Sequence, residues 1–327
     1  MIPNAAFLDA GSTGDADLTP LHRLPMALSL YPSTAPDQVV SRLQQHQIAI
    51  VNKVVLDAAI IRQLPQLRYI AVTATGTNNV DLIAASHAGI TVQNVSDYAT
   101  AAVAQHVFAL LLHLTNQCAA YQQAVQQGKW SQSPHFCLLE HPIQELAGQT
   151  MTIVGYGVLG QATAKLAQAF GMTVCVAERP GATLCRPGRT PFRDALTQAD
   201  VLSLHCPLTS DNQQLIGAEQ LSWLKPSAIL INTARGGLVD STALLKALQQ
   251  QQLQAAALDV LELEPPPAEH PLLQRPHPRL LLTPHVAWAS RAARNRLIAT
   301  VARQLTHWLQ QRSESNGPTT SCTARPK

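Results

Sequence analysis

The sequence predicts an α/β protein built around parallel sheets, and three observations support this prediction. From residue 150 onward, short aliphatic runs alternate with segments of helical character. The runs are apolar throughout, as expected for strands covered on both faces of a parallel sheet. The first hundred residues repeat the alternation on a smaller scale. We therefore predict two open α/β domains, the larger a Rossmann-type doubly wound sheet and the smaller flavodoxin-like.

Six apolar runs form the predicted strands of the larger domain. One helical segment follows the first run directly, and others lie near 192–199, 217–224 and 241–251. Strands joined by helical crossovers lie parallel in one sheet. The predicted strands are TMTIVGYG, MTVCVAE, VLSLHC, AILINTA, QAAALDV and RLLLTPH.

The smaller domain has five predicted strands and shorter helices. The helices lie near 36–46, 57–64 and 81–88. This count and order are typical of a small open α/β sheet. The predicted strands are FLDA, MALSLY, IAIVN, YIAVTA and ITVQN.

Two long helical segments, 97–118 and 286–311, flank the larger domain. The simplest arrangement makes them the two crossings between domains, so that one domain is discontinuous. The polar tail has the composition of a disordered segment. The predicted division is 1–98 with 286–327 for the discontinuous domain, 99–285 for the larger domain, and 313–327 for the tail.

Composition limits the classes of partner. Charged residues make up 13% of the chain and the net charge is only +3, spread without long blocks, so we expect neither nucleic acid nor a membrane surface as a partner. The apolar segment 99–114 is interrupted by Gln105, His106 and His113, which favours a core helix over a membrane span. The six cysteines form no C-x-x-C pair, and no signal peptide is evident. We expect reduced thiols, no metal site and a cytoplasmic location.

A glycine motif marks a candidate dinucleotide site. The stretch GYGVLG follows a predicted strand and opens a predicted helix. In this context the first glycine makes a tight turn, the second lets backbone N–H groups approach a pyrophosphate, and the third lets helix and strand pack closely. The positive end of the helix dipole adds to phosphate binding. The residues assigned to the cofactor here are Gly155, Gly157, Val158, Leu159 and Gly160.

The choice between NAD and NADP depends on the end of the next predicted strand. A carboxylate at Glu178 can accept both hydroxyls of the adenosine ribose and would repel a 2′-phosphate. The adjacent Arg179 is compatible with a contact to a 2′-phosphate, or with a solvated loop position. We predict NAD as the cofactor, with NADP as the alternative.

Three polar residues follow predicted strands in the second half of the larger domain. They are Arg235, Glu264 and His285. Each alone is explained by a surface or loop position. Ligands of open α/β sheets bind beyond the carboxyl ends of the strands, where these three residues would share one edge. We therefore interpret them as a catalytic constellation.

Five stretches then carry a resemblance to a known family. VGYGVLG, LHCPLT, LINTARGGLVD, ALDVLELEPP and TPHVAWAS resemble, in the same order, motifs of the D-isomer-specific 2-hydroxyacid dehydrogenases, and most of all bacterial glycerate dehydrogenases or hydroxypyruvate reductases. The resemblance extends over about 7–310. It implies that 99–285 binds the dinucleotide and that the discontinuous domain binds the substrate.

The chemistry of 2-keto acid reduction matches the three residues. Arg235 carries a planar, permanently charged fork that can grip a carboxylate and polarise a carbonyl. His285 is suited to acid–base work because imidazole titrates near neutrality. Glu264 would orient the His285 ring and favour its protonated form. The resemblance implies the same roles at these positions.

Other contacts are implied by the resemblance alone. Backbone N–H groups near Thr75 and Gly76, in the stretch TATGTNNVD, would bind the substrate carboxylate, although an ordinary Gly-Asn turn explains the pattern equally well. Trp288 would line the substrate pocket or belong to the core. The further implied cofactor contacts are Cys206, Pro207, Thr233, Ala234 and, at the nicotinamide carboxamide, Asp259.

The sequence thus predicts an NAD(P)H-dependent reductase of hydroxypyruvate and glyoxylate that also oxidises D-glycerate. A dehydrogenase of another D-2-hydroxy acid and a dinucleotide-sensing protein resembling transcriptional corepressors remain as alternatives. The resemblance implies a homodimer, with the helix at 99–118 and the polar excursion at 129–147 as its interface.

Overall fold

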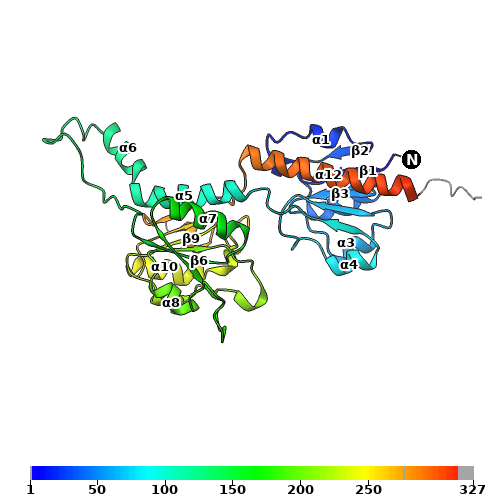
Figure 1. Ribbon diagram of the computed structural model, residues 1–327. Coiled ribbons are helices and arrows are strands. Elements are labelled where there is room, and N and C mark those ends of the chain that lie inside the picture. Colours follow the sequence, from blue (N-terminus) through cyan, green and yellow to red (C-terminus); the bar gives the residue numbers. More distant parts are fainter. Residues whose placement is uncertain (1, 275–276, 316–327) are drawn as a thin grey trace, which may run out of the picture. The chain divides into compact units, whose positions relative to one another are not determined.

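The computed structural model describes residues 2–274 and 277–315. The chain divides into two units, one formed by Met1–Ala99 with Ser290–Lys327 and the other by Thr100–Ala289. Figure 1 shows that each unit is a parallel sheet with helices on its faces. The predicted fold class, a Rossmann-type sheet plus a smaller α/β domain, is confirmed.

The larger unit holds a six-stranded sheet of order β11-β10-β9-β8-β6-β7, with every neighbouring pair parallel. The order reverses between β6 and β8, which is the switch point where open α/β sheets bind ligands. All six predicted runs form strands: β6 (Thr150–Val154), β7 (Thr173–Ala177), β8 (Val201–Leu204), β9 (Ile229–Asn232), β10 (Ala255–Leu258) and β11 (Leu280–Leu282).

Helices cover both faces of this sheet, and strand residues alternate between two apolar clusters. Ile229 and Ile231 of β9 join the cluster under α5 and α7, whereas Leu230 joins the cluster under α8 to α10. This alternation explains why the strands are apolar throughout. None of the described helices has the length and apolar character to cross a membrane. The helices are α5 (Thr100–Asn116), α6 (Cys118–Gln126), α7 (Val158–Ala169), α8 (Phe192–Thr197), α9 (Ala218–Trp223), α10 (Ser241–Gln249) and α11 (Pro271–Gln274), with 3₁₀ turns η3 (Ser210–Asn212) and η4 (Gly236–Leu238).

The smaller unit holds a five-stranded parallel sheet of order β2-β1-β3-β4-β5. Its strands are β1 (Asn4–Phe7), β2 (Ala27–Leu30), β3 (Ile48–Val51), β4 (Tyr69–Val72) and β5 (Thr91–Gln93). Its helices are α1 (Thr19–His22), α2 (Val39–Leu43), α3 (Ala58–Arg62), α4 (Leu82–His87) and α12 (Arg291–Ser315), with 3₁₀ turns η1 (Ala10–Thr13) and η2 (Pro36–Gln38).

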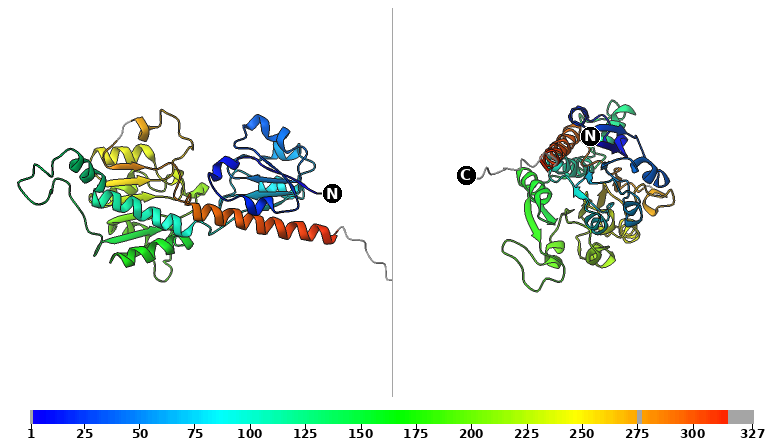
Figure 2. Two further views of the ribbon diagram at one scale, coloured as in Figure 1. Left: turned by 90° about the horizontal axis from the view of Figure 1, so that it is seen from above. Right: turned by 90° about the vertical axis from the view of Figure 1, so that its right-hand side faces the viewer.

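Helix α12 packs on the smaller unit (Figures 1 and 2). Its Trp308 ring lies 5.1 Å from the ring of Tyr69, and its Gln304 Nε2 donates to the Asn94 carbonyl at 2.9 Å. On the other face of this sheet, Ile70 and Val72 of β4 pack in the cluster that includes residues of α2 to α4. The last helix therefore completes the fold of the first ninety residues.

Four predicted boundaries are wrong. The first strand ends at Phe7 rather than beginning there, because Asp9 accepts hydrogen bonds from the backbone N–H groups of residues 52–54 and the chain then turns into η1. The helix predicted over 97–118 ends at Asn116, because Gln117 adopts a left-handed conformation with φ 52°.

The other two boundaries belong to α12. The helix predicted from 286 begins only at Arg291, after a turn in which the Ala289 N–H donates to the Val286 carbonyl at 2.9 Å. The predicted disordered tail begins within this helix, which extends to Ser315. The rest of that tail, 316–327, lies outside the described residues.

Candidate active site

The glycine motif joins β6 to α7, as the sequence predicts. Gly155 has φ +93°, and a Cβ on it would lie 2.4 Å from the backbone nitrogen of Cys206. A Cβ on Gly160 would lie 2.2 Å from the carbonyl oxygen of Gly155, so this glycine lets the helix pack against the turn. A Cβ on Gly157 would meet nothing within 4 Å. The space beside Gly157, at the N-terminus of α7, is therefore open to a ligand.

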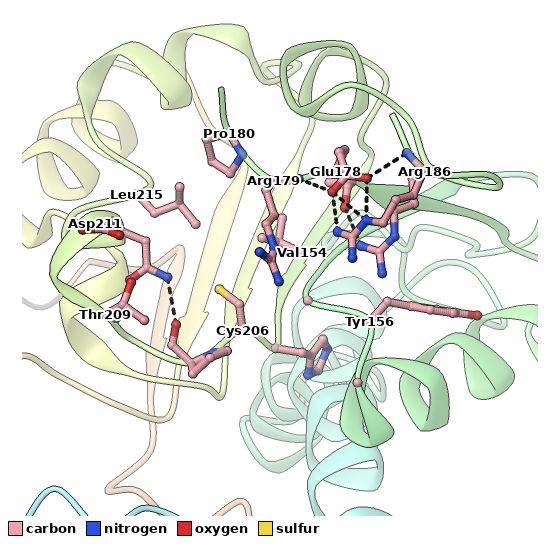
Figure 3. A pocket seen from close by; sticks show the side chains of 17 residues that line it. Val154, Tyr156, Glu178, Arg179, Pro180, Arg186, Cys206, Thr209, Asp211 and Leu215 are labelled. Carbon is pink, nitrogen blue, oxygen red and sulfur yellow. Dashed lines mark hydrogen bonds and ion pairs between the residues drawn. The ribbon is translucent and has the colours of Figure 1, made fainter. Parts of the chain in front are cut away.

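A cavity of about 670 Å³ opens over this motif (Figure 3). It includes six of the predicted cofactor residues: Gly155, Gly157, Glu178, Arg179, Cys206 and Pro207. The cavity lining does not include the other six, which are Val158, Leu159, Gly160, Thr233, Ala234 and Asp259. Cofactor contacts of these six residues stay predictions.

Two buried polar atoms at the strand ends have no hydrogen-bond partner among the described residues. One is Nδ1 of His205, which follows β8, and the other is Oγ1 of Thr233, which follows β9. Buried polar groups in native proteins are normally satisfied, so such atoms commonly mark a ligand site. Together with the open helix N-terminus at Gly157, they fit a dinucleotide lying along the carboxyl ends of the strands.

Glu178, predicted to hold the adenosine ribose, has protein partners in this structure, and its contact to the ribose stays a prediction. Its side chain is 4% exposed and accepts hydrogen bonds from the backbone N–H of Arg179 at 2.8 Å and of Arg186 at 3.0 Å. The guanidinium of Arg186 donates to it from Nε, at 2.8 Å to Oε2, and from Nη2 to Oε1. These bonds hold the pKa of Glu178 well below its usual range, the Arg186 side chain having the largest effect. The sequence interpretation missed Arg186, whose only signal was a basic residue in the following loop.

The predicted acid–base pair is formed directly. Nδ1 of His285 lies 2.5 Å from Oε2 of Glu264, while Oε1 of Glu264 accepts the backbone N–H of Leu261 at 3.0 Å. Glu264 follows β10 and His285 follows β11, and these strands are neighbours in the sheet. The carboxylate thus fixes one ring nitrogen of His285 and leaves Nε2 as the nitrogen that can face a substrate.

A buried aspartate positions the His285 loop. Asp259, 1% exposed, accepts hydrogen bonds from the Thr283 hydroxyl at 2.5 Å and from the backbone N–H groups of Val286 at 2.9 Å and Ala287 at 2.8 Å. Burial alone would raise the pKa of Asp259. His106, 3.4 Å away, and these hydrogen bonds lower it by more, so the pKa of Asp259 lies below its usual value. These contacts fix the backbone of the His285 loop against the end of β10.

Arg235 lies on the neighbouring loop, after β9. A Cβ on Gly236 would lie 1.8 Å from the carbonyl carbon of Leu261, so glycine is required where the Arg235 loop meets the loop that carries Glu264. Asn232, fully buried at the end of β9, donates from Nδ2 to the Arg235 carbonyl at 2.8 Å. The three predicted catalytic residues thus follow three adjacent strands on one edge of the sheet.

A second link between these loops was not predicted. The Ser241 hydroxyl donates to Oε1 of Glu262 at 2.5 Å, and His270 Nε2 lies 3.1 Å from Oε2 of the same carboxylate. Glu262 lies between Ser241 and His270, so the serine hydroxyl and the imidazole do not contact each other as a nucleophile and its base would. The group instead links the loops that carry these residues. No motif or spacing in the sequence indicates this link.

The remaining predicted substrate contacts are Thr75, Gly76 and Trp288. The Thr75 hydroxyl donates to the Val95 carbonyl at 3.1 Å, and Asn94 Nδ2 donates to the Thr75 carbonyl at 2.6 Å, which fixes this loop of the smaller unit. The Trp288 indole donates to the His285 carbonyl at 2.8 Å. Trp288 therefore supports the His285 loop, and the substrate contacts of all three stay predictions.

Comparison with known proteins identifies relatives of similar length. The family described as D-isomer specific 2-hydroxyacid dehydrogenase, NAD binding domain, matches residues 108–287. The chain is 44% identical over 294 residues to a glycerate dehydrogenase of Methylorubrum extorquens, covering 90% of this chain and 92% of the relative. It is also 44% identical over 283 residues to a putative 2-hydroxyacid dehydrogenase of Haemophilus influenzae, covering 86% and 90%.

A solved structure extends the likeness. The NADPH-dependent glyoxylate/hydroxypyruvate reductase of Sinorhizobium meliloti, in complex with NADP and malonate, superposes with a TM-score of 0.77 at 28% identity, covering 94% of each chain. The family match includes the glycine motif and the three predicted catalytic residues, Arg235, Glu264 and His285, which we call the catalytic edge. The chain therefore belongs to the D-isomer-specific 2-hydroxyacid dehydrogenases, enzymes that use a nicotinamide dinucleotide to interconvert 2-keto acids and D-2-hydroxy acids.

Proposed function

We propose that this enzyme reduces hydroxypyruvate to D-glycerate, accepts glyoxylate as a second substrate, and catalyses the reverse oxidation. The observation that carries the proposal is the 2.5 Å contact between His285 and Glu264, beside the loop that presents Arg235. The similarity to a glycerate dehydrogenase and to a glyoxylate/hydroxypyruvate reductase supports this choice among 2-keto acids.

Each residue of the catalytic edge has a role in the reduction. Arg235 pairs its guanidinium with the substrate carboxylate and polarises the ketone. A bound reduced nicotinamide supplies the hydride to the carbonyl carbon. His285 donates the Nε2 proton to the carbonyl oxygen, which becomes the new hydroxyl, and Glu264 stabilises the imidazolium before the transfer. In the oxidation, neutral His285 accepts that proton.

The other predicted contacts complete the proposal. Thr75 and Gly76 offer backbone N–H groups to the substrate carboxylate, and Trp288 shapes the pocket. Asp259 accepts from the nicotinamide carboxamide. Thr233 and Ala234 lie beside the nicotinamide, and the orphaned hydroxyl of Thr233 supports a polar ligand there.

A panel of 2-keto acids tests the function. The purified protein is mixed with NADH or NADPH and with hydroxypyruvate, glyoxylate, pyruvate or a bulkier keto acid, and loss of absorbance at the nicotinamide band is followed. We expect hydroxypyruvate to give the highest kcat/KM. A higher value for a bulkier acid would assign the enzyme to another D-2-hydroxy acid. Dinucleotide binding without turnover of any acid would instead support the dinucleotide-sensing alternative.

We also propose that the enzyme is a homodimer. The segment that follows α6, which extends away from the larger sheet in Figure 1, exposes large apolar side chains. Phe136 is 91% exposed and Leu139 is 84% exposed, and Trp130 and Ile143 are also exposed. Clustered apolar exposure of this kind is typical of a protein interface. Sedimentation as a monomer at micromolar concentration would contradict the proposal.

A cytoplasmic location is part of the same proposal. The five cysteines among the described residues are all free thiols, as expected for a reducing compartment. Fractionation of the host cell, with immunodetection of the enzyme, tests it.

A further inference from the structure

The loop that carries Glu264 is anchored by a second carboxylate, Glu262, two residues earlier. The two oxygens of Glu262 contact different elements, since the Ser241 hydroxyl donates to Oε1 at 2.5 Å and His270 Nε2 lies 3.1 Å from Oε2. We propose that Glu262 is a positioning residue for the reaction, because it sets the place of Glu264 relative to Arg235. The proposal rests on the proposed function, which gives both of these residues a role in the reduction.

The hydrogen bonds of His270 fix the direction of its contact with Glu262. The imidazole is only 9% exposed, and its Nδ1 accepts the backbone N–H of Leu272 at 3.3 Å. A ring nitrogen that accepts a hydrogen bond carries no proton, so the proton of this ring is on Nε2. Nε2 therefore donates to Glu262, and an ionised carboxylate, which only accepts hydrogen bonds, is a matching partner.

The Ser241 end of the link belongs to the segment that carries Arg235. The chain passes from Arg235 through the turn η4 and begins α10 at Ser241, which is 6% exposed. The side chain of Asp240 caps this helix by accepting two backbone N–H groups of its first turn, at 2.9 and 3.0 Å. The first turn of α10 is thus held in place, and the bond from Ser241 ties Glu262 to it.

The backbone at Leu261 connects this anchor to both catalytic loops. Its N–H donates to Oε1 of Glu264 at 3.0 Å, and its side chain packs against the core cluster under α8 to α10. A Cβ on Gly236 would lie 2.1 Å from the Leu261 carbonyl oxygen and 2.4 Å from the Glu262 nitrogen. A shift of Glu262 would therefore move the donor that holds Glu264 and would press on the loop of Arg235.

The alternative is that the group serves only to hold α11, the short helix that begins directly after His270. The two ring nitrogens separate these roles, because Nδ1 contacts the backbone of α11 and Nε2 contacts Glu262. Glutamine at this position places an amide donor near Nε2, whereas asparagine places an amide oxygen near Nδ1. Two substitutions of His270 therefore test the two roles separately.

Steady-state kinetics on the full chain test the proposal, with the keto acid that gives the highest wild-type kcat/KM. His270→Asn keeps an acceptor for Leu272 but removes the donor to Glu262. We expect its kcat/KM to fall about 10- to 100-fold, because a displacement of about 1 Å at a catalytic group has an effect of this size. His270→Gln keeps the donor and should retain most of the wild-type value. Equal losses, or a larger loss in His270→Gln, would overturn the proposal.

Variants at Glu262 locate the effect. Glu262→Gln keeps an acceptor for Ser241 but turns an amide donor toward His270, so its kcat/KM should fall as much as that of His270→Asn. The double variant should be no slower than either single variant, because both changes break the same bond. Losses that multiply in the double variant would contradict the proposal.

Two further variants complete the series. Ser241→Ala breaks the other end of the link and should lower kcat/KM in the same way, which provides an independent test if a Glu262 variant does not fold. Glu219→Gln removes the same charge from an exposed position in the first turn of α9, in the same unit. This control should leave kcat/KM unchanged, and a fall equal to that of Glu262→Gln would overturn the proposal.

The outcomes separate this inference from the proposed function. Calorimetry on the same preparations should give an unchanged Kd for the dinucleotide, and an equal loss of binding and activity would indicate a general structural defect and overturn the inference. Wild-type kinetics in both Glu262→Gln and His270→Asn would overturn the inference and leave the dehydrogenase assignment standing. A folded wild-type chain that reduces no keto acid would overturn both. Circular dichroism and thermal unfolding show whether each variant is folded.

Discussion

At the β10–β11 end of the larger sheet, the carboxylate of Glu264 accepts a hydrogen bond from the imidazole of His285. At the β7 end, the carboxylate of Glu178 accepts hydrogen bonds from the guanidinium of Arg186. Imidazole can lose its proton near neutral pH, whereas guanidinium stays charged at every working pH. The first pair can therefore transfer a proton, and the second can only hold a shape and a charge. The partner of a carboxylate decides whether it serves chemistry or recognition.

The two regions also differ in how they treat histidine. His285 is partly exposed and paired with a carboxylate. His205, which follows β8 in the cofactor region, is also half-buried, but its Nδ1 is buried without a hydrogen-bond partner among the described residues and its Nε2 contacts the Ser203 hydroxyl at 2.9 Å. Burial lowers the pKa of His205 to about 4, so this ring is neutral at working pH. Only the histidine with an ionised partner is suited to donate a proton.

The largest expected effect is loss of the proton donor. His285→Gln keeps a polar side chain of similar reach but cannot deliver a proton. We expect kcat for keto-acid reduction to fall roughly 10²- to 10⁴-fold at every pH, with dinucleotide Kd unchanged. Steady-state kinetics and calorimetry on the same preparation provide both values. Retention of most of the wild-type kcat would show that another group supplies the proton.

A smaller effect is expected where the two catalytic loops meet. Gly236→Ala would place a methyl group 1.8 Å from the Leu261 carbonyl carbon, so one loop must shift. A displacement of about 1 Å at a catalytic group can cost on the order of 10²-fold in rate, and we expect such a fall in kcat/KM. Gly237→Ala is the matched control, because its Cβ would meet only the end of the Leu208 side chain, at 2.9 Å. Equal activities for the two variants would mean that the loops do not depend on this contact.

In the cofactor region, lowering the pH should reduce the free energy of unfolding because of His205. Its pKa is about 4 in the folded chain and about 6.5 when unfolded, so the unfolded state takes up the proton first as pH falls. We expect His205 to contribute a loss of about 2 kcal/mol of unfolding free energy between pH 7 and pH 5. Urea unfolding of wild type and His205→Gln at both pH values measures this. The variant should lose correspondingly less, and identical losses would refute the assignment.

Sequence reasoning succeeded where local pattern decides the structure. Apolar runs placed Arg235, Glu264 and His285 at adjacent strand ends, and the glycine spacing predicted the turn into α7. It failed where a distant partner decides. The segment 286–287, predicted to be helical, instead belongs to the loop that carries His285, whose N–H groups of Val286 and Ala287 donate to Asp259, far back in the chain.

The pairing of Glu178 with Arg186 was not predicted either. Residue type and strand position predicted a ribose acceptor, and that contact stays a prediction. The loop from 179 to 189 folds back so that Arg186 saturates the carboxylate. That loop is polar and has no periodicity, so the sequence contains no pattern from which this pairing could be read. Tertiary partners, rather than residue type, set the availability of a charge.

The central claim is that the Glu264 carboxylate holds the His285 ring in the position from which it protonates the keto acid. Glu264→Gln preserves size and a hydrogen-bonding group but removes the negative charge beside the ring. The direct measurement is kcat for hydroxypyruvate reduction by wild type and Glu264→Gln, with the Kd of the dinucleotide measured on the same preparations. We expect kcat of the variant to fall on the order of 10²-fold, because the catalytic ring is no longer held in place, and the Kd to stay unchanged. A wild-type kcat in the variant would contradict the account.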